Sequence, residues 1–444
     1  MQLKKPGSVP TALMAASCAL LGASTAKADD SYESDDWQVD SALLYYKEDQ
    51  QRVQAIEPVV SLKRDFGDDR SLGVKLTYDS LSGGSPNGAL PSHSPQTFAT
   101  PSGASLQAPS GEPQTYTTSS GRVVALLEKV TLYTTEPGQL PLDPNFHDQR
   151  VAFSTSWQQR LGEQMRLSVG GDLSHEQDFM SAGLNAALAR DFNNKNTTLS
   201  FGTNLEADAI RPIGGAPVGG TDYTQLQKGG NESKTVGGVL FGVTQVLSRR
   251  WLAQLNYSYD ASHGYQTDPY KLLSVIDAGG NAVGYRFENR PDNRTRQSVF
   301  LENKLALGRD VLDLSLRHMK DNWGIKSQTA DLRYRLELGN AMYIEPHARY
   351  YKQNAASFYN LYLNAADPAP DVMSADPRLG AFDAMTYGLK LGMTLADKSE
   401  VSIRLEQYRQ NARDVPAAFG QLQGLDLNPG LKSFIFQVGW RFSF

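Results

Sequence analysis

In the second half of the chain, titratable residues alternate with apolar ones. In residues 331–338, every odd position is charged and every even position is leucine or tyrosine. On one face of neighbouring strands, such groups form cross-strand ion pairs and arginine–carboxylate forks. The network would either brace a wall or line a constriction that selects among ions. The candidate residues, expected to line a lumen, are Asp313, Arg317, Asp331, Arg333, Arg335, Glu337, Glu345, His347, Arg349, Arg404, Glu406 and Arg441.

The arginines and carboxylates of this set nearly balance, so a pure anion filter is not expected. One sign of charge would face the water only if the members of each pair were unequally buried. We predict a partly neutralised arginine ladder with a weak preference for anions. Changing Arg333 and Arg335 to alanine is then expected to shift the selectivity of an open barrel toward cations.

The sequence gives little support for catalysis or for binding of a metal or cofactor. The six histidines show no spacing that pairs a base with a nucleophile, and no H-x-x-x-H, C-x-x-C or haem-attachment motif is present. We therefore expect no enzyme, no catalytic residue, no metal site and no cofactor. Asp268, Asp277 and Asp292 match no calcium-loop spacing and are interpreted as solvated loop charges. A lipid anchor at Cys18 is disfavoured, because Ala15 stands where a leucine would be expected.

The elements that position the charged face are strands, and the end of the chain shows this best. From Phe434 onward every second residue is apolar, and the chain stops on an aromatic residue. A strand of this kind has one face in an apolar medium and the other in water. The segment is similar to the C-terminal strand by which Gram-negative outer-membrane barrels are recognised for insertion. The residues of this predicted insertion signal are Phe436, Val438, Trp440, Phe442 and Phe444.

Similar alternating runs recur between residues 37 and 444, and we count about sixteen. Their connections are alternately short and long, as in outer-membrane barrels, which place short turns in the periplasm. An even number of strands brings Phe444 back to the side where Trp37 begins. The predicted fold is all-β, a transmembrane antiparallel β-barrel of about 16 strands with long extracellular loops, formed by residues 29–444. The run Lys234–Leu247 alternates poorly and predicts a bulge.

Two long connections interrupt this pattern. Residues 81–147 begin with a stretch rich in serine, proline, glycine and threonine, which predicts a partly disordered extracellular loop. Lys271–Asp277 and Ala282–Glu288 flank a turn sequence and predict a hairpin. Its arms have about seven residues, fewer than the roughly 9–11 of a membrane strand. We expect an extracellular hairpin, and a barrel of eighteen strands stays open as the alternative.

The N-terminal segment predicts export. Residues 1–28 carry Lys4 and Lys5, an apolar run and the sequence Ala26-Lys27-Ala28, which is typical of a secretory signal peptide cleaved after Ala28. Removing its three lysines takes the formal charge from −5 to −8. This acidic balance argues against nucleic acid as a partner. The expected location is the outer membrane of a Gram-negative bacterium, with membrane lipid and the barrel assembly machinery as partners.

Several segments spread over most of the mature chain carry a family resemblance. They are Leu140–Asp143 with Phe146–Ala152, Asp268–Val275, Arg290–Arg296, Asp331–Arg335, Pro346–Tyr351 and Arg378–Asp383. These segments resemble a family of Gram-negative surface proteins known as domain of unknown function 3570. The resemblance implies no established activity or catalytic residue. It does imply an exported redox or other periplasmic partner, because family members are found near genes for flavin-attaching and thioredoxin-like exported proteins.

Two functions follow from these observations. The first is a pore or channel for small polar solutes, since a barrel of sixteen strands is wide enough to hold an aqueous channel. The second is a barrel sheath or docking scaffold for an exported redox or periplasmic partner protein. We favour the pore.

Overall fold

The computed structural model describes residues 36–67, 69–100, 115–117, 123–125, 131–213, 215–224 and 229–444. The predicted signal peptide, its cleavage site and part of the connection 81–147 lie outside these residues. Within the described ranges, no helix is long and apolar enough to cross a membrane.

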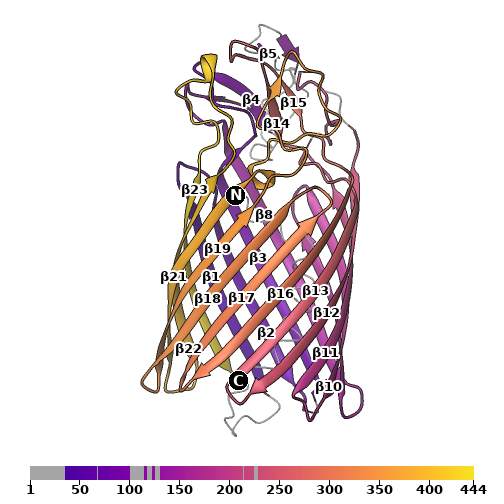
Figure 1. Ribbon diagram of the computed structural model, residues 1–444, viewed down its shortest axis with the longest axis vertical. Helices are drawn as coiled ribbons and strands as arrows, with labels where there is room; N and C mark the ends of the chain where they lie inside the picture. Colours follow the sequence, from indigo (N-terminus) through magenta and orange to yellow (C-terminus); the bar gives the residue numbers. More distant parts are fainter. Residues whose placement is uncertain are drawn as a thin grey trace.

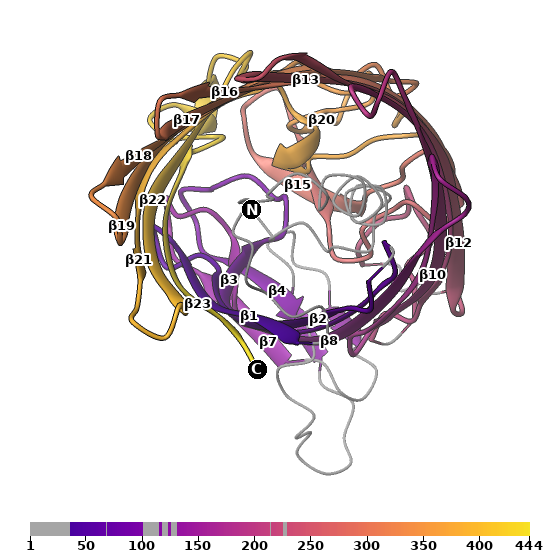
Figure 2. The ribbon, with the colours of Figure 1, turned by 90° about the horizontal axis from the view of Figure 1, so that it is seen from below.

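Sixteen strands form one closed antiparallel barrel (Figures 1 and 2), as the alternation predicts. The eighteen-stranded alternative is wrong. The barrel closes between the first and last strands, where Trp37 and Phe444 exchange two backbone hydrogen bonds of 2.9 and 3.0 Å. The strands, in barrel order, are β1 (Trp37–Glu48), β2 (Gln54–Asp65), β3 (Ser71–Pro86), β8 (Leu142–Arg160), β9 (Met165–His175), β10 (Phe179–Phe192), β11 (Thr197–Ile210), β12 (Glu232–Ser248), β13 (Trp251–Gly264), β16 (Asn293–Leu307), β17 (Asp310–Asp321), β18 (Lys326–Leu338), β19 (Met342–Gln353), β21 (Phe382–Thr394), β22 (Glu400–Ala412) and β23 (Leu431–Ser443).

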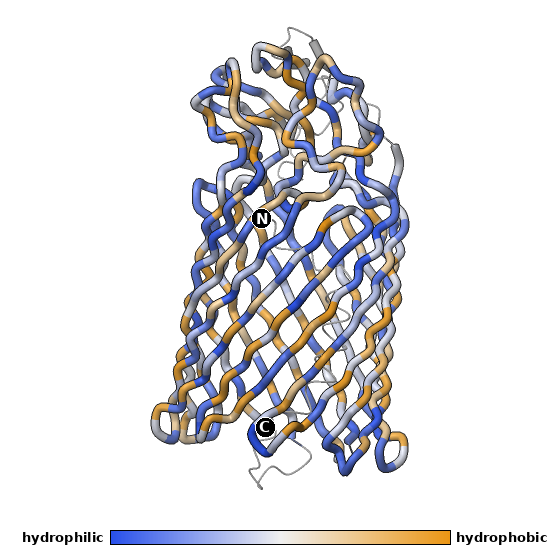
Figure 3. The backbone as a smooth tube through the Cα atoms, in the orientation of Figure 1, coloured by the Kyte–Doolittle hydropathy of each residue, from blue (hydrophilic) through white to orange (hydrophobic). Residues whose placement is uncertain are grey.

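The outer wall of the barrel is apolar. Large apolar side chains at alternate positions stand exposed on it, with Leu184 at 71% and Leu205 at 68% of their full accessibility. Figure 3 shows the matching alternation of hydrophobic and hydrophilic residues along the strands. An exposed apolar surface of this size is unfavourable in water but favourable against the hydrocarbon of a bilayer. The outer wall is therefore the lipid-facing surface.

Seven short turns gather at the end of the barrel that holds the C-terminus (Figure 1). Left-handed backbone makes two of them tight: Gly308 has φ 73°, and Asn193 and Asn194 have φ 50° and 55°. Glycine and asparagine tolerate this conformation best. By the rule that short turns are periplasmic, this end faces the periplasm. The predicted bulge in β12 is confirmed, because the register with β13 shifts between Val246 and Ser248.

The long connections at the other end fold into a cap (Figure 1). We use "cap" for the described residues of the connections 87–141, 211–231, 265–292, 354–381 and 413–430. Its strands are β4 (Gln96–Thr100), β5 (Thr115–Thr117), β6 (Val123–Ala125), β7 (Thr131–Thr135), β14 (Leu272–Ile276), β15 (Ala282–Phe287) and β20 (Leu363–Asn364), and its 3-10 helices are η1 (Pro377–Leu379) and η2 (Gly420–Leu422). The predicted extracellular hairpin is confirmed as β14 and β15, with β20 beside β14 in parallel.

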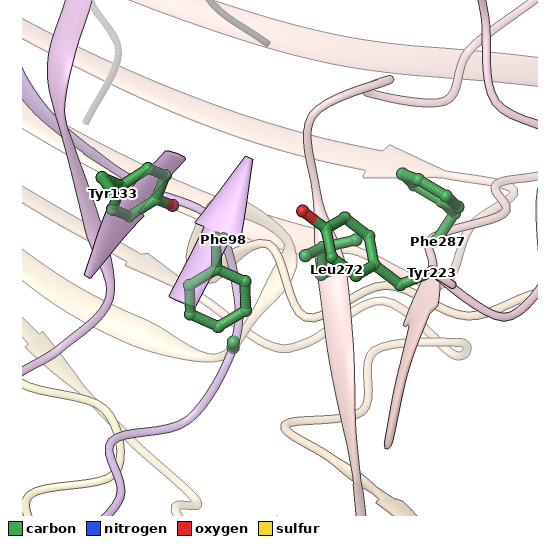
Figure 4. Packing of buried hydrophobic residues seen from close by; sticks show 6 residues of the cluster. Phe98, Tyr133, Tyr223, Leu272 and Phe287 are labelled. Atoms are coloured by element: carbon green, nitrogen blue, oxygen red, sulfur yellow. The ribbon is translucent and has the colours of Figure 1, made fainter. Parts of the chain in front are cut away.

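The cap has apolar cores of its own. Phe98 from β4 and Tyr133 from β7 lie near Tyr223, Leu272 and Phe287 of three other cap segments (Figure 4). The tyrosine hydroxyls are satisfied, since Asn87 donates to Tyr133 at 3.0 Å and the Ala99 amide donates to Tyr223 at 2.8 Å. Buried aromatic rings with bonded hydroxyls hold segments in one arrangement. Seen from the periplasmic end, β4, β15 and β20 lie inside the outline of the barrel wall (Figure 2).

Candidate functional site

The charged face predicted from sequence is the face opposite the apolar wall. On β18, Leu332 and Leu338 are exposed outside at 41% and 47%. Successive side chains of a strand point to opposite faces. Asp331, Arg333 and the other odd-numbered residues of this strand therefore point into the lumen, and the same parity holds on β17 and β19.

The first group of these residues surrounds His347 on β19. Its Nε2 lies 3.1 Å from Asp331 on β18, and its Nδ1 lies 2.9 Å from Glu406 on β22. Carboxylates accept hydrogen bonds, so both ring nitrogens donate and the imidazole carries a positive charge. Arg404 extends the group, with nitrogens 3.4 Å from Glu406 and 3.6 Å from Glu345. Neither nitrogen of His347 is left to activate a nucleophile.

A glycine on the strand between them allows His347 to reach Glu406. Gly388 on β21 pairs with His347 on one side and with Glu406 on the other. A Cβ at Gly388 would lie 2.5 Å from Cγ of Glu406. Because glycine has no side chain, the imidazole and the carboxylate can meet across β21.

A second group lies nearer the periplasmic turns and is built around Tyr343. Arg335 lies over the Tyr343 ring with its guanidinium carbon 3.5 Å from the centroid, and it pairs with Glu337 at 2.7 Å. The Tyr343 hydroxyl donates to Glu400 at 2.6 Å. The ring is almost fully buried because it lies over Gly392, where a side chain would collide with it. A cation–π contact and a hydrogen bond thus join β18, β19 and β22.

The remaining members of the predicted set are placed differently. Asp313 lies 3.7 Å from Lys304 of β16, and Arg441 lies 2.6 Å from Asp40 of β1. Arg333 lies 3.5 Å from Asp331.

Arg317 and Arg349 have no ion pair within 4.0 Å among the residues that the structure describes. Both are exposed, and Arg317 rests over Phe300 at 5.1 Å. Thr329 of β18 pairs with Arg317 on one side and with Tyr351, two residues from Arg349, on the other. Arg317 is close enough to interact electrostatically with Arg349 and, beyond contact distance, with the carboxylate of Asp260. The structure therefore leaves two neighbouring cations of the set without a contacting counter-charge.

The two signs of lumen charge are unequally buried. In the pair Arg333–Asp331 the arginine side chain is 43% exposed and the carboxylate 14%, and in Arg404–Glu406 the values are 25% and 10%. Arginine and lysine are long enough to reach past the acids that hold them. On the other side of the barrel, five inward acids are buried in the wall, namely Asp79, Asp191, Glu206, Asp208 and Asp260. In the two ion pairs above, the basic side chain is therefore the partner that reaches lumen water.

Several contributors to the network are absent from the predicted set. Tyr343, Lys304 and Glu400 each hold a predicted residue in place. Lys304 lies on the inward face of a run that alternation predicts as a strand, and Glu400 comes directly before another such run, so extending the alternation to β16 and β22 would have found them. Alternation places Tyr343 on the inward face but does not show what it contacts. Its role depends on Gly392 being opposite, which only the register shows.

One group of acidic residues could hold a metal ion by geometry. Asp148, Glu176 and Asp178, at the cap end of β8 and in the connection from β9 to β10, have ligand atoms within 4.8 Å of one another. Tyr270 also donates to Asp178 at 2.6 Å. Acidic clusters at a rim are common without an ion, and we assign no site to this one. The interpretation of Asp268 as a solvated loop charge is wrong, because its carboxylate binds Arg378 at 3.0 Å inside the cap.

The predicted insertion signal lies at the seam of the barrel. In the register of β23 with β1, Phe436 opposes Tyr45, Val438 opposes Leu43 and Phe442 opposes Val39. Trp440 and Phe444 are exposed on the outer wall, at 49% and 68%. The side chains of the strand thus stand where lipid and a membrane-embedded partner would meet them.

A closed antiparallel barrel with an apolar outer wall and a charged inner wall defines the class of outer-membrane β-barrel proteins. Within this class, the chain belongs to the family described as "Protein of unknown function (DUF3570)", whose model matches residues 10–442. The family predicted from the sequence segments is therefore confirmed. A comparison with curated proteins finds no match.

Solved structures of similar architecture have low identity to this chain. A mutant of the ferric enterobactin receptor PfeA from Pseudomonas aeruginosa is 9% identical, with a TM-score of 0.40 over 85% of this chain, which spans 54% of the receptor. The outer membrane protein OpdK from Pseudomonas aeruginosa is 10% identical, with a TM-score of 0.37 over 92% of this chain and 99% of OpdK. A mutant of OccD1 (OprD) is 11% identical, with a TM-score of 0.39 over 94% of this chain and 98% of OccD1. We transfer no function from these structures.

Proposed function

We propose that the barrel is a diffusion channel for small polar solutes with a weak preference for anions. The observation that carries the proposal is the unequal burial of charge in the lumen. Several acids are buried in the wall, while Arg317 and Arg349 stand exposed with no counter-charge within 4.0 Å among the residues that the structure describes. Exposed rings or arcs of one sign of charge set the selectivity of a pore.

The expected preference is modest, because the lumen charges act through water. Two unit charges 4 Å apart interact by about 1 kcal/mol in water. About 1.4 kcal/mol corresponds to a factor of ten in an equilibrium. One unscreened arginine would then enrich anions roughly fivefold and deplete cations roughly fivefold at most, and salt reduces both factors.

Conductance of the purified protein in planar bilayers tests the proposal. We expect stable ohmic conductance and, in asymmetric potassium chloride, a reversal potential on the anion side. Persistent silence of a correctly folded barrel would contradict the channel. Silence together with a co-purifying exported protein would favour the sheath or docking scaffold instead.

We also propose that the barrel assembly machinery recognises the terminal strand. Deletion of Phe444 removes the aromatic residue that follows β23 and both of its backbone bonds to Trp37. Loss of most heat-modifiable barrel from the outer membrane is the expected result, with Ser443→Ala as the control. Wild-type accumulation of the truncated chain would rule out this role for Phe444.

A further inference from the structure

A small cavity lies where the cap meets the rim of the barrel. It has a volume of about 70 Å³ and is largely enclosed. Its wall includes Arg52 from the connection between β1 and β2, Lys271 before β14, and Asp376 and Arg378 beside η1. A cavity needs roughly 10–15 Å³ by this measure to hold one water molecule. The space therefore suits about five non-hydrogen atoms.

Arg52 is a buried cation with no adequate partner. It is 7% exposed, and its Nε has no hydrogen-bond partner. Its remaining contacts, from NH2 to Oε1 of Gln50 and to the carbonyl of Pro429, are both 3.5 Å long. No carboxylate of the described residues lies within ion-pair distance, although Glu48, Asp49 and Asp426 act on Arg52 from farther away. A buried charge normally has a paired and hydrogen-bonded partner.

Lys271 is the second under-used cation in this cavity. Its side chain is buried, and its ammonium donates to the carbonyl of Pro86. An ammonium has three donors. No ion pair of Lys271 lies within 4.0 Å among the described residues, although Asp268 and Asp376 act on it from farther away. Arg290, a buried arginine elsewhere in the cap, shows the usual solution, with Glu288 at 2.7 Å and Asp376 at 2.8 Å. By that standard Arg52 and Lys271 each lack an anion.

The rest of the lining suits an anion as well. Three basic side chains and one acid contribute to it, and the acid, Asp376, is already engaged by Arg290 and Arg378. Gln410 accepts a hydrogen bond from Tyr408 at its Oε1, 2.7 Å away, so its amide nitrogen remains as a donor. Leu361 and Leu427 contribute an apolar part of the wall. Hydrogen bonds from a buried cation to an oxyanion are about twice as strong as neutral ones.

We propose that this cavity binds one small oxyanion, a phosphate or a carboxylate group, between Arg52 and Lys271. The anion would complete the bonding of both cations and fasten the cap to the barrel rim. The site stands apart from conduction through the lumen, so it does not rest on the proposed channel.

The test is calorimetric titration of the full-length protein in detergent with inorganic phosphate and, separately, with acetate. We expect one saturable site per chain for at least one of the two ions. Arg52→Met and Lys271→Met should each weaken binding at least tenfold. Lys326→Gln, which removes an exposed positive charge at the same end of the barrel, should leave binding unchanged.

The two anions also separate the sources of the ligand. Phosphate binding alone indicates a tetrahedral anion, and acetate binding alone indicates the carboxylate of an organic solute. Heat-modifiable mobility on gels shows whether each variant has folded, and Arg52→Lys serves as a second variant that keeps the charge and should retain part of the affinity. Absence of saturable binding of both ions to the wild type, or equal binding by folded Arg52→Met, would overturn the proposal.

Discussion

The lumen and the cap both contain ion-pair networks, and the two are built differently. In the lumen, pairs join residues two apart on one strand, such as Arg333–Asp331, or residues of neighbouring strands, such as Arg441–Asp40, and water reaches the basic partner. In the cap, Arg378, two residues further along the chain, and Arg290 from another connection converge on Asp376, and side chains shield the carboxylate from water. Half-exposed ion pairs contribute little stability, but their charges still create an electrostatic field in the lumen. Buried pairs are costly to break one partner at a time.

The cap network should therefore give the largest effect on stability. Arg290→Met leaves Glu288 and Asp376 buried with one cation fewer, which should destabilise the cap by about 3–5 kcal/mol. Arg335→Met in the lumen should cost less than about 1 kcal/mol. Hydrogen exchange of cap amides measures the first effect, and the unfolding midpoint in denaturant measures the second. Equal small effects would mean that the cap network is as well hydrated as the lumen.

The wall itself is tested by a charge placed on its outer face. Leu332→Arg, near the middle of β18, should cost about 2–4 kcal/mol because the position faces lipid. Leu336→Arg, near the periplasmic end of the strand, should cost less. Ser315→Arg, on the inner face of β17, is the matched control and should be nearly neutral. Equilibrium unfolding from lipid vesicles gives the free energies, and a reversed order would mean that the strand register is displaced by one residue.

The two networks should also differ in their response to acid. Burial opposes the ionisation of Asp376, but Arg378 and Arg290 outweigh it and hold its pKa well below its usual range. Its stabilising contribution is therefore complete above the unfolded pKa of about 3.9 and is lost as the pH falls through the folded value.

The pH dependence of the stability contribution of Glu288 has the opposite sign. Burial raises the pKa of Glu288, so its contribution to stability fades as the pH rises. The difference in hydrogen-exchange protection of the cap amides between the wild type and Asp376→Asn isolates the contribution of Asp376. We expect this difference to shrink in acid below about pH 4, as measured by hydrogen exchange at several pH values. A constant difference down to pH 2 would show that Asp376 does not supply the charge.

Sequence alone predicts the wall far better than the cap. Alternation fixes which face of β18 carries Asp331 and Arg333, because a period of two is set by the strand itself. It does not show that Arg317 and Arg349 lack partners, since tilt and shear decide which residues of different strands meet. The contacts of Asp268 with Arg378 join residues 110 positions apart in irregular connections. No periodicity records such a contact, and solvated loop charge was the wrong prediction there.

The structure also changes which arginines should set selectivity. Arg333 and Arg335 each contact an acid, so replacing them uncovers Asp331 and Glu337 as well as removing positive charge. A cation shift in that variant would reflect both effects. Arg317 and Arg349 have no such partner, which makes their removal the simpler experiment.

The most direct test is the reversal potential of Arg317→Gln/Arg349→Gln in asymmetric potassium chloride. The account predicts that the anion preference of the wild type falls severalfold and approaches neutrality, with conductance retained. The control is Lys195→Gln/Arg249→Gln, which removes two charges from exposed periplasmic turns and should leave the reversal potential at the wild-type value. An unchanged reversal potential in an open, conducting double variant of Arg317 and Arg349 would contradict the account.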